Sequence, residues 1–151
     1  MSETPANNMD EFYLYRFEDL QVGMSAAYAK TVTDADIVLF AGITGDINPV
    51  HLNQEFAVGT MFEGRIAHGM LSAGFVSTVL GTKLPGPGTI YLSQTLKFKA
   101  AVRAGDTVVA RATITALNPA KRRATLDTVC TVGGKVVMDG VAEIMLPPRT
   151  N

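Results

Sequence analysis

Asp46 and His51 are the residues of this sequence best suited to acid–base chemistry. They stand five positions apart in TGDINPVHLN, the stretch 44–53, whose glycine and proline favour an irregular loop with a short helical turn after Asn53. A carboxylate and an imidazole that such a loop brings together can hold one water molecule between them and exchange its protons. Spacing alone also leaves open, and favours, a simpler interpretation, in which Asp46 caps a turn and His51 is a surface histidine.

A second group of candidate residues begins at His68, where an almost uncharged segment starts. We expect His68 to cap or fix the start of a helix rather than to react. Gly69 has no side chain, so an anionic oxygen can approach the unpaired N–H groups and positive dipole of the helix N-terminus; alternatively, it only allows close packing on a sheet. Ser77 can share the helix face of Gly69, although composition alone favours a small packed residue bonded to the preceding turn.

The elements that position these groups follow from hydrophobic patterning. A first strand is expected over 24–32. Thr33 followed three residues later by Asp36 matches a capping box, which predicts a helix that Gly42 and Gly45 stop. The apolar side of this helix is expected to consist of Ile37, Val38, Phe40 and Ala41.

The segment 69–80 is nearly uncharged and apolar on every side, which is typical of a buried helix. After the breaker LPGPG at 84–88, apolar and polar residues alternate, and this two-residue period predicts strands. Asn118-Pro119 is expected to turn one pair, and Gly133-Gly134 can adopt the positive φ of a tight hairpin. The C-terminal half is therefore expected to be an antiparallel meander. Its strands are expected over 90–98, 108–114, 122–132 and 135–146.

These elements predict an α+β fold, a strongly curved antiparallel sheet wrapped around one central helix, and not a βαβ arrangement. Such a sheet leaves an unpaired edge, and pairing two edges across a two-fold axis would cover it. The mean hydropathy of +0.19 is high for a small chain, and an apolar interface would explain it. We therefore expect a homodimer.

Composition limits the class of protein. The 151 residues are 47% hydrophobic and 18% charged, which fits one domain over 13–151 after a flexible arm over 1–12. A net charge of −1 without charged runs argues against nucleic acid or membrane partners. Cys130 is the single cysteine, so we expect no internal disulfide and no structural zinc site. Without an evident signal peptide or long apolar run, we expect a soluble cytoplasmic protein.

Four motifs together resemble the MaoC-like dehydratase family, most closely its short, single-domain (R)-specific enoyl-CoA hydratases. The motifs are GDINPVH at 45–51, IAHGML at 66–71, LPG at 84–86 and VRAGD at 102–106. The resemblance covers roughly residues 18–147. The D-x-N-P-x-H stretch followed by HGML at this distance is its most specific part.

The resemblance implies a hot-dog fold that dimerises into a continuous double hot-dog, with two active sites near the subunit interface. By similarity, Asp46 and His51 form the catalytic pair, the backbone N–H of Gly69 holds the thioester oxygen, and Ser77 lies beside the site. The implied activity is reversible (R)-specific hydration of trans-2-enoyl-CoA to (R)-3-hydroxyacyl-CoA. Coenzyme A is part of this small-molecule substrate, and no other cofactor is implied.

Such a hydration needs a nucleophile at C3, a proton for C2 and stabilisation of the enolate oxygen. Asp46 as base with His51 orienting the water is the favoured assignment, and which of the two is the formal base stays open. Asn48, which precedes a proline, is expected to shape the loop. No metal is required, because the unsaturated thioester is already polarised. Leu80 and Ile144 are the expected walls of an acyl pocket that limits the chain to short or medium groups.

Two other functions stay open. A hot-dog thioesterase would use the same helix terminus but attack the carbonyl carbon. A non-catalytic acyl-thioester binding protein would carry Asp46 and His51 as structural residues. The carrier is open as well, and the near-neutral charge without a basic patch favours coenzyme A over acyl carrier protein.

Overall fold

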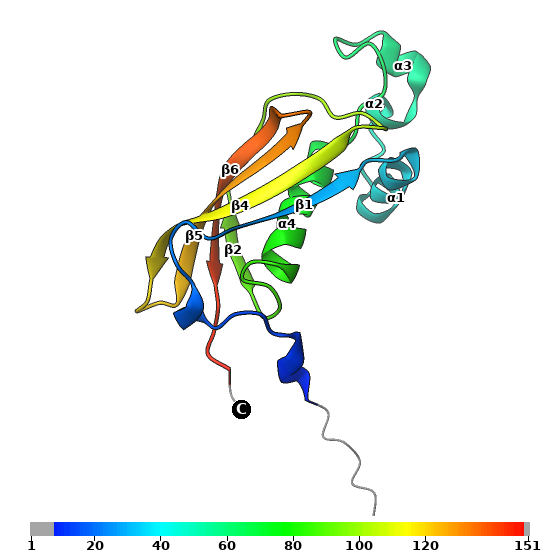
Figure 1. Cartoon of the computed structure of the whole chain (residues 1–151). Helices are drawn as coiled ribbons and strands as arrows, with labels where there is room; N and C mark the ends of the chain where they lie inside the picture. The colour runs from blue at the N-terminus through cyan, green and yellow to red at the C-terminus, as the bar shows by residue number, and fades with distance from the viewer. Residues whose placement is uncertain (1–7, 150–151) are drawn as a thin grey trace, which may run out of the picture.

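One antiparallel sheet and a long helix dominate the computed structural model, which describes residues 8–149 (Figure 1). The helices are α1 (Asp34–Thr44), α2 (Pro49–Leu52), α3 (Gln54–Val58) and α4 (Gly69–Thr82). The strands are β1 (Ser25–Thr31), β2 (Ile90–Gln94), β3 (Lys97–Phe98), β4 (Thr107–Asn118), β5 (Arg123–Val132) and β6 (Lys135–Met145). Two 3-10 helices, η1 (Met9–Phe12) and η2 (Phe17–Asp19), precede β1. Among the described residues, no helix is both long and apolar enough to cross a membrane.

The strands form one sheet in the order β1-β4-β5-β6-β2, with β3 also on β6, and every pairing is antiparallel. The sheet curves along α4 (Figure 1), so the predicted α+β architecture is confirmed. The meander is confirmed for β4, β5 and β6. Its last hairpin turns at Gly133 and Gly134, whose φ angles of 56° and 80° are the positive values that the sequence predicts.

The prediction of a single strand over 90–98 is wrong. The segment is divided into β2 and β3, and it pairs with β6 rather than with β4, the next long strand in the sequence. The interruption includes Thr95, whose carbonyl oxygen would lie 1.8 Å from a Cβ atom at Gly140 of β6. Because only glycine permits so close a backbone approach, Gly140 allows the non-strand segment between β2 and β3 to lie against β6.

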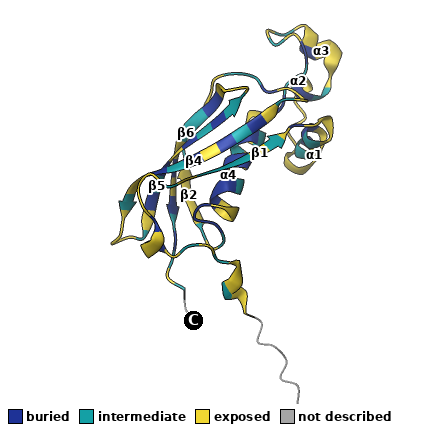
Figure 2. Cartoon of the chain, viewed as in Figure 1, coloured by how far each residue is buried: buried dark blue, intermediate teal, exposed yellow. Residues whose placement is uncertain are grey.

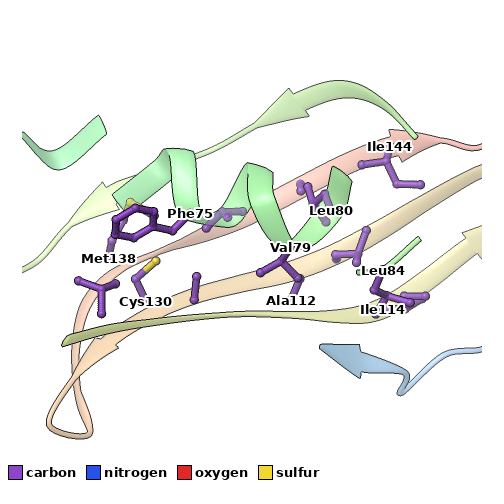
Figure 3. Close-up of a cluster of buried hydrophobic side chains, with 14 of the residues drawn as sticks. Phe75, Val79, Leu80, Leu84, Ala112, Ile114, Cys130, Met138 and Ile144 are labelled. Carbon is purple, nitrogen blue, oxygen red and sulfur yellow. The ribbon is translucent and has the colours of Figure 1, made fainter. Parts of the chain in front are cut away.

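The hydrophobic core lies between α4 and the inner face of the sheet (Figure 3). Phe75 and Val79 of α4 are buried in it. The side chains around them include Leu80, Leu84, Ala112, Ile114, Cys130, Met138 and Ile144. In the single chain α4 is not buried on every side, because Met70 is 53% exposed and Gly74 and Ser77 are exposed too. In this chain the sheet covers one side of α4 and leaves the other uncovered (Figure 2).

The predicted capping box starts α1. The Thr33 hydroxyl accepts the Asp36 N–H at 3.1 Å, and the Asp36 carboxylate accepts the Thr33 N–H at 2.9 Å. A hydrogen bond from Lys30, together with that from Thr33, lowers the pKa of Asp36. Gly45 ends α1 with φ of 81°, as predicted, whereas Gly42 lies within the helix and does not stop it. Of the four residues expected on the apolar side, Ile37 and Ala41 are the buried ones.

The described part of the predicted flexible arm has local structure. Met9–Phe12 forms the single turn η1, capped by the Asn8 side chain. The chain then reaches the core through Phe17 and Leu20, which are both buried. Residues 1–7 lie outside the described residues, and the arm prediction for them is untested.

Candidate active site

The segment from Gly45 to His68 carries the candidate residues and contains more helix than the sequence predicts. The stretch 44–53 is not a loop throughout, because α2 lies within it and places His51 in its single turn. Asn48 caps α2 by accepting the Val50 N–H at 3.1 Å, and Pro49 occupies the first helical position, where a missing N–H costs nothing. Asn48 therefore shapes this segment, as predicted. The expected turn after Asn53 is α3.

His51 is buried with its ring held in one orientation. The residue is 8% exposed, and its Nδ1 lies 2.8 Å from the carbonyl oxygen of Ile66. Because a carbonyl oxygen only accepts hydrogen bonds, Nδ1 donates, and the lone pair of the neutral ring is on Nε2. Arg65 supports the same turn by donating from Nε to the His51 carbonyl oxygen at 2.7 Å. His51 thus keeps a basic nitrogen for chemistry.

Asp46 lies beside His51, so the structure brings the predicted pair together. A carboxylate oxygen of Asp46 and one ring nitrogen each from His51 and His68 all lie within 4.8 Å of one another. Asp46 is exposed in the single chain, and its N–H donates to the Thr44 hydroxyl at 3.1 Å. The three groups are also of the types that bind metal ions. The site can therefore polarise and deprotonate a small polar molecule held between them.

His68 plays a part that the sequence did not reveal. It precedes the first residue of α4 but makes no side-chain hydrogen bond there, so of the two roles expected for it, capping is wrong and fixing the start of the helix remains. Its Nε2 instead lies 2.8 Å from the carbonyl oxygen of Asp46. The His68 ring stacks on His51, with centroids 3.8 Å apart and planes 30° apart. The two residues are separated by 17 positions, and no local pattern relates them.

A cavity of about 460 Å³ connects His51 to the start of α4. Both His51 and Gly69 line it, together with Ser72. The remaining walls include Met61, Phe62, Phe98, Val102, Val137 and Met138. The walls are mainly apolar, and their polar side chains are those of His51, Ser72 and Lys99. A mainly apolar cavity with a few polar groups is the usual form of a small-molecule site.

Gly69 begins α4, as predicted, and its lack of a side chain has a direct structural reason. A Cβ atom there would lie 2.6 Å from two ring carbons of Phe98. The lack of a side chain at Gly69 therefore leaves space for the Phe98 ring, and both residues line the cavity. Its unpaired N–H groups and positive dipole favour a developing negative charge.

Ser77 and the two predicted acyl-pocket residues lie away from this cavity. Ser77 lines a second hollow of about 400 Å³, and Met70 lines both hollows. Leu80 and Ile144 are core residues (Figure 3), 1% and 0% exposed. Neither lines the cavity beside His51. They are close to the second hollow in the fold, because Leu80 follows Ser77 by about one helical turn and Ile144 pairs with Tyr91, which lines it.

Cys130 does not supply a nucleophile. Its thiol is buried beneath α4, 3.6 Å from the carbonyl oxygen of Ser72. Burial raises the pKa of the Cys130 thiol to about 11. The reactive thiolate is therefore scarce near neutral pH, and a covalent cysteine mechanism for thioester cleavage is disfavoured.

Comparison with known proteins gives consistent results. The family model described as MaoC like domain matches residues 19–137. An (R)-specific enoyl-CoA hydratase from Rhodospirillum rubrum is 57% identical over 140 residues, which cover 93% of this chain and 97% of the relative. A 3-hydroxybutyryl-CoA dehydratase from Methylorubrum extorquens is 48% identical over 141 residues, which cover 93% of this chain and 90% of the relative.

The solved structure of an (R)-hydratase from A. caviae, involved in PHA biosynthesis, matches the fold with a TM-score of 0.83 at 44% identity. The match covers 86% of this chain and 99% of that chain. It confirms the predicted hot-dog arrangement, in which an antiparallel sheet wraps a central helix. From the extent of the family match and the identity to these relatives, the chain belongs to the MaoC-like dehydratase family.

Proposed function

We propose that this protein is a hydro-lyase that adds water reversibly to trans-2-enoyl-CoA, giving (R)-3-hydroxyacyl-CoA. The observation that carries the proposal is the meeting of the Asp46 carboxylate and the His51 imidazole beside the N-terminus of α4. The related (R)-specific enoyl-CoA hydratase and 3-hydroxybutyryl-CoA dehydratase support the same reaction type. With a buried free thiol at Cys130, the enzyme is suited to a reducing cytoplasm.

The proposed reaction divides its work among three groups. Asp46 takes a proton from water as the water oxygen bonds to C3, and the lone pair on Nε2 of His51 orients that water. The π electrons of the C2–C3 bond move to the thioester oxygen, where the N–H of Gly69 stabilises the enolate. The enolate then collapses, and C2 takes up the proton carried by the Asp46–His51 pair. Dehydration follows the same steps in reverse.

Gly69→Ala is predicted to lower kcat/KM for crotonyl-CoA by about 10²–10³-fold, the usual cost of losing an oxyanion-hole donor. The added methyl would lie 2.6 Å from Phe98, so either the ring or the start of α4 must move. Initial hydration rates measure the effect. Gly81→Ala is the matched control, because that α4 glycine has open space around its Cβ position. Unchanged activity of a Gly69→Ala variant in which a crystal structure shows the start of α4 displaced would contradict the assigned role of the helix N-terminus.

The acyl group is assigned to the hollow beside Ser77, with Leu80 and Ile144 at its inner end. Removing bulk from Leu80 is then predicted to shift the preferred substrate toward longer chains, because a cavity opens where the chain ends. The kcat/KM ratio for octenoyl-CoA over crotonyl-CoA should rise by at least about tenfold in Leu80→Ala, the lower end of the discrimination that one methylene gives in an apolar pocket. An unchanged ratio in a folded variant would refute this assignment.

A homodimer is part of the proposal. The edge strand β2 and the helix α1 both carry apolar side chains that are exposed in a single chain. These residues are Ile90, Tyr91 and Leu92 on β2, and Val38, Leu39 and Ile43 on α1. Burying them against a second copy removes apolar surface from water and covers a sheet edge.

Sedimentation equilibrium is expected to give twice the 16.1 kDa chain mass. Leu92→Lys should shift the protein toward monomers by placing a charge in the interface, whereas Val22→Lys, at a 62% exposed site before β1, should stay dimeric. A monomeric wild-type protein would contradict the dimer.

The function is tested by mixing the purified protein with crotonyl-CoA and following two signals in parallel. The proposal predicts loss of the enoyl-thioester absorbance without release of free thiol. Thiol release without this loss would indicate a thioesterase instead. Binding of the thioester with neither signal, also for longer enoyl-CoA substrates, would indicate a binding protein.

A further inference from the structure

We propose that His68 is a positioning residue that holds Asp46 and His51 in their reactive arrangement. The inference rests on the proposed hydratase function and assigns His68 no contact with the substrate. His68 is 2% exposed, directly before α4, and it contacts both members of the pair.

The first contact fixes the Asp46 backbone. Nε2 of His68 lies 2.8 Å from the Asp46 carbonyl oxygen, across 22 positions of the sequence. The carbonyl accepts, so Nε2 carries the hydrogen. Asp46 is exposed. Its carboxylate accepts a hydrogen bond from the Asn48 N–H at 3.3 Å, a distance near the limit for a hydrogen bond. The shorter, part-buried bond from His68 is therefore the stronger restraint on where the carboxylate lies.

The second contact fixes the plane of His51. The His51 ring is pinned at Nδ1 by Ile66 and stacked on its face by His68. Phe40 of α1 lies against the His68 ring in turn, with centroids 4.6 Å apart. His68 thereby links α1, α2 and the start of α4. A displacement of about 1 Å in such a site can cost about 10²-fold in rate.

The remaining nitrogen of His68 does not fit a purely structural histidine. With the hydrogen on Nε2, Nδ1 has a lone pair, and this buried atom has no hydrogen-bond partner within residues 8–149. Most buried polar side-chain atoms are paired. An apolar residue at this position would pack without leaving a buried nitrogen unpaired. The unpaired Nδ1 is therefore explained by a need for the ring's other nitrogen, which donates to Asp46, and for its face, which stacks on His51.

Two variants separate the two contacts. His68→Gln removes the ring that stacks on His51, but the new amide nitrogen reaches close to the position of Nε2 and keeps a donor for the Asp46 carbonyl. His68→Phe keeps a ring for stacking and removes the donor. We expect His68→Phe to lower kcat for crotonyl-CoA by about 10²-fold with KM changed less than about threefold. His68→Gln should recover at least about tenfold of that loss.

Melting curves and the Kd of butyryl-CoA, a saturated thioester that cannot be hydrated, show whether each variant folds and binds. A folded His68→Phe with kcat within about twofold of wild type would overturn the inference. Equal losses in folded His68→Phe and His68→Gln would also overturn it, because the inference assigns most of the restraint to the donor, which His68→Gln keeps and His68→Phe lacks.

Imidazole nitrogen NMR tests the geometry without relying on activity. The chain has two histidines, so the spectrum holds two rings. The inference requires one ring protonated at Nδ1, which is His51, and one at Nε2, which is His68, with the His51 signals displaced in His68→Phe. Two Nε2–H rings, or His51 signals unaffected by the substitution, would overturn it. A wild-type protein that shows the required tautomers but hydrates no enoyl-CoA would instead refute the proposed function.

Discussion

Asp46→Asn should lower kcat for hydration of crotonyl-CoA by about 10³–10⁴-fold, at the upper end of what general acid–base catalysis contributes. Asparagine has nearly the same shape as aspartate but cannot take a proton from water. The backbone bonds of residue 46 to Thr44 and His68 do not involve the carboxylate and should persist. Initial rates over a range of substrate concentrations separate kcat from KM.

The matched control for this change is Asp127→Asn, which also removes one exposed carboxylate but lies on β5, outside the cavity lining. Its activity should equal that of wild type. Asp46→Asn should still bind butyryl-CoA, because the lost group acts on water and not on the thioester. If Asp46→Asn kept more than about a tenth of wild-type kcat, the assignment of Asp46 as base would be wrong.

His51→Asn should lower kcat by about 10²–10³-fold. The amide nitrogen of asparagine can take the place of Nδ1 and donate to Ile66, so the local backbone should be retained. The lone pair of Nε2 is lost, and with it the group that orients the attacking water. The same kinetic assay measures the effect, and a melting curve shows whether the fold is kept.

Comparing the two variants bears on which residue is the base. A larger loss in Asp46→Asn than in His51→Asn supports Asp46, and the reverse order supports His51. The double variant should lose little more than Asp46→Asn alone, since the two residues act on one water molecule as a unit. Wild-type turnover in His51→Asn would remove His51 from the mechanism altogether.

Local signals in the sequence predicted much of the fold. The capping box of Thr33 and Asp36 and the hairpin at Gly133 depend on neighbours within a few residues, and both are present in the structure. The strands β4, β5 and β6 were recognisable because alternate residues along much of each are buried in the core. The order of the strands could not be predicted from local patterns, because the close approach of the Thr95 backbone to Gly140 involves residues 45 positions apart in the sequence.

In the candidate site, too, the sequence predicted what neighbouring residues determine and missed the contacts between distant segments. Asp46 and His51 share one short segment, and their meeting follows from its turns and from the motif they form. The contacts of His68 with Asp46 and of Phe98 with Gly69 connect distant segments, and only the folded chain reveals them. The uncovered face of α4 was missed for a related reason: an apolar pattern indicates that a surface becomes buried, but not whether the same chain or a second copy covers it.

The central claim is that the Asp46–His51 pair adds water to one face of an enoyl thioester. Chiral analysis of the product formed from crotonyl-CoA by the wild-type protein tests it most directly. The proposed function predicts (R)-3-hydroxybutyryl-CoA and no free coenzyme A. The (S) product, a racemic product or free coenzyme A in place of the hydroxy ester would contradict it.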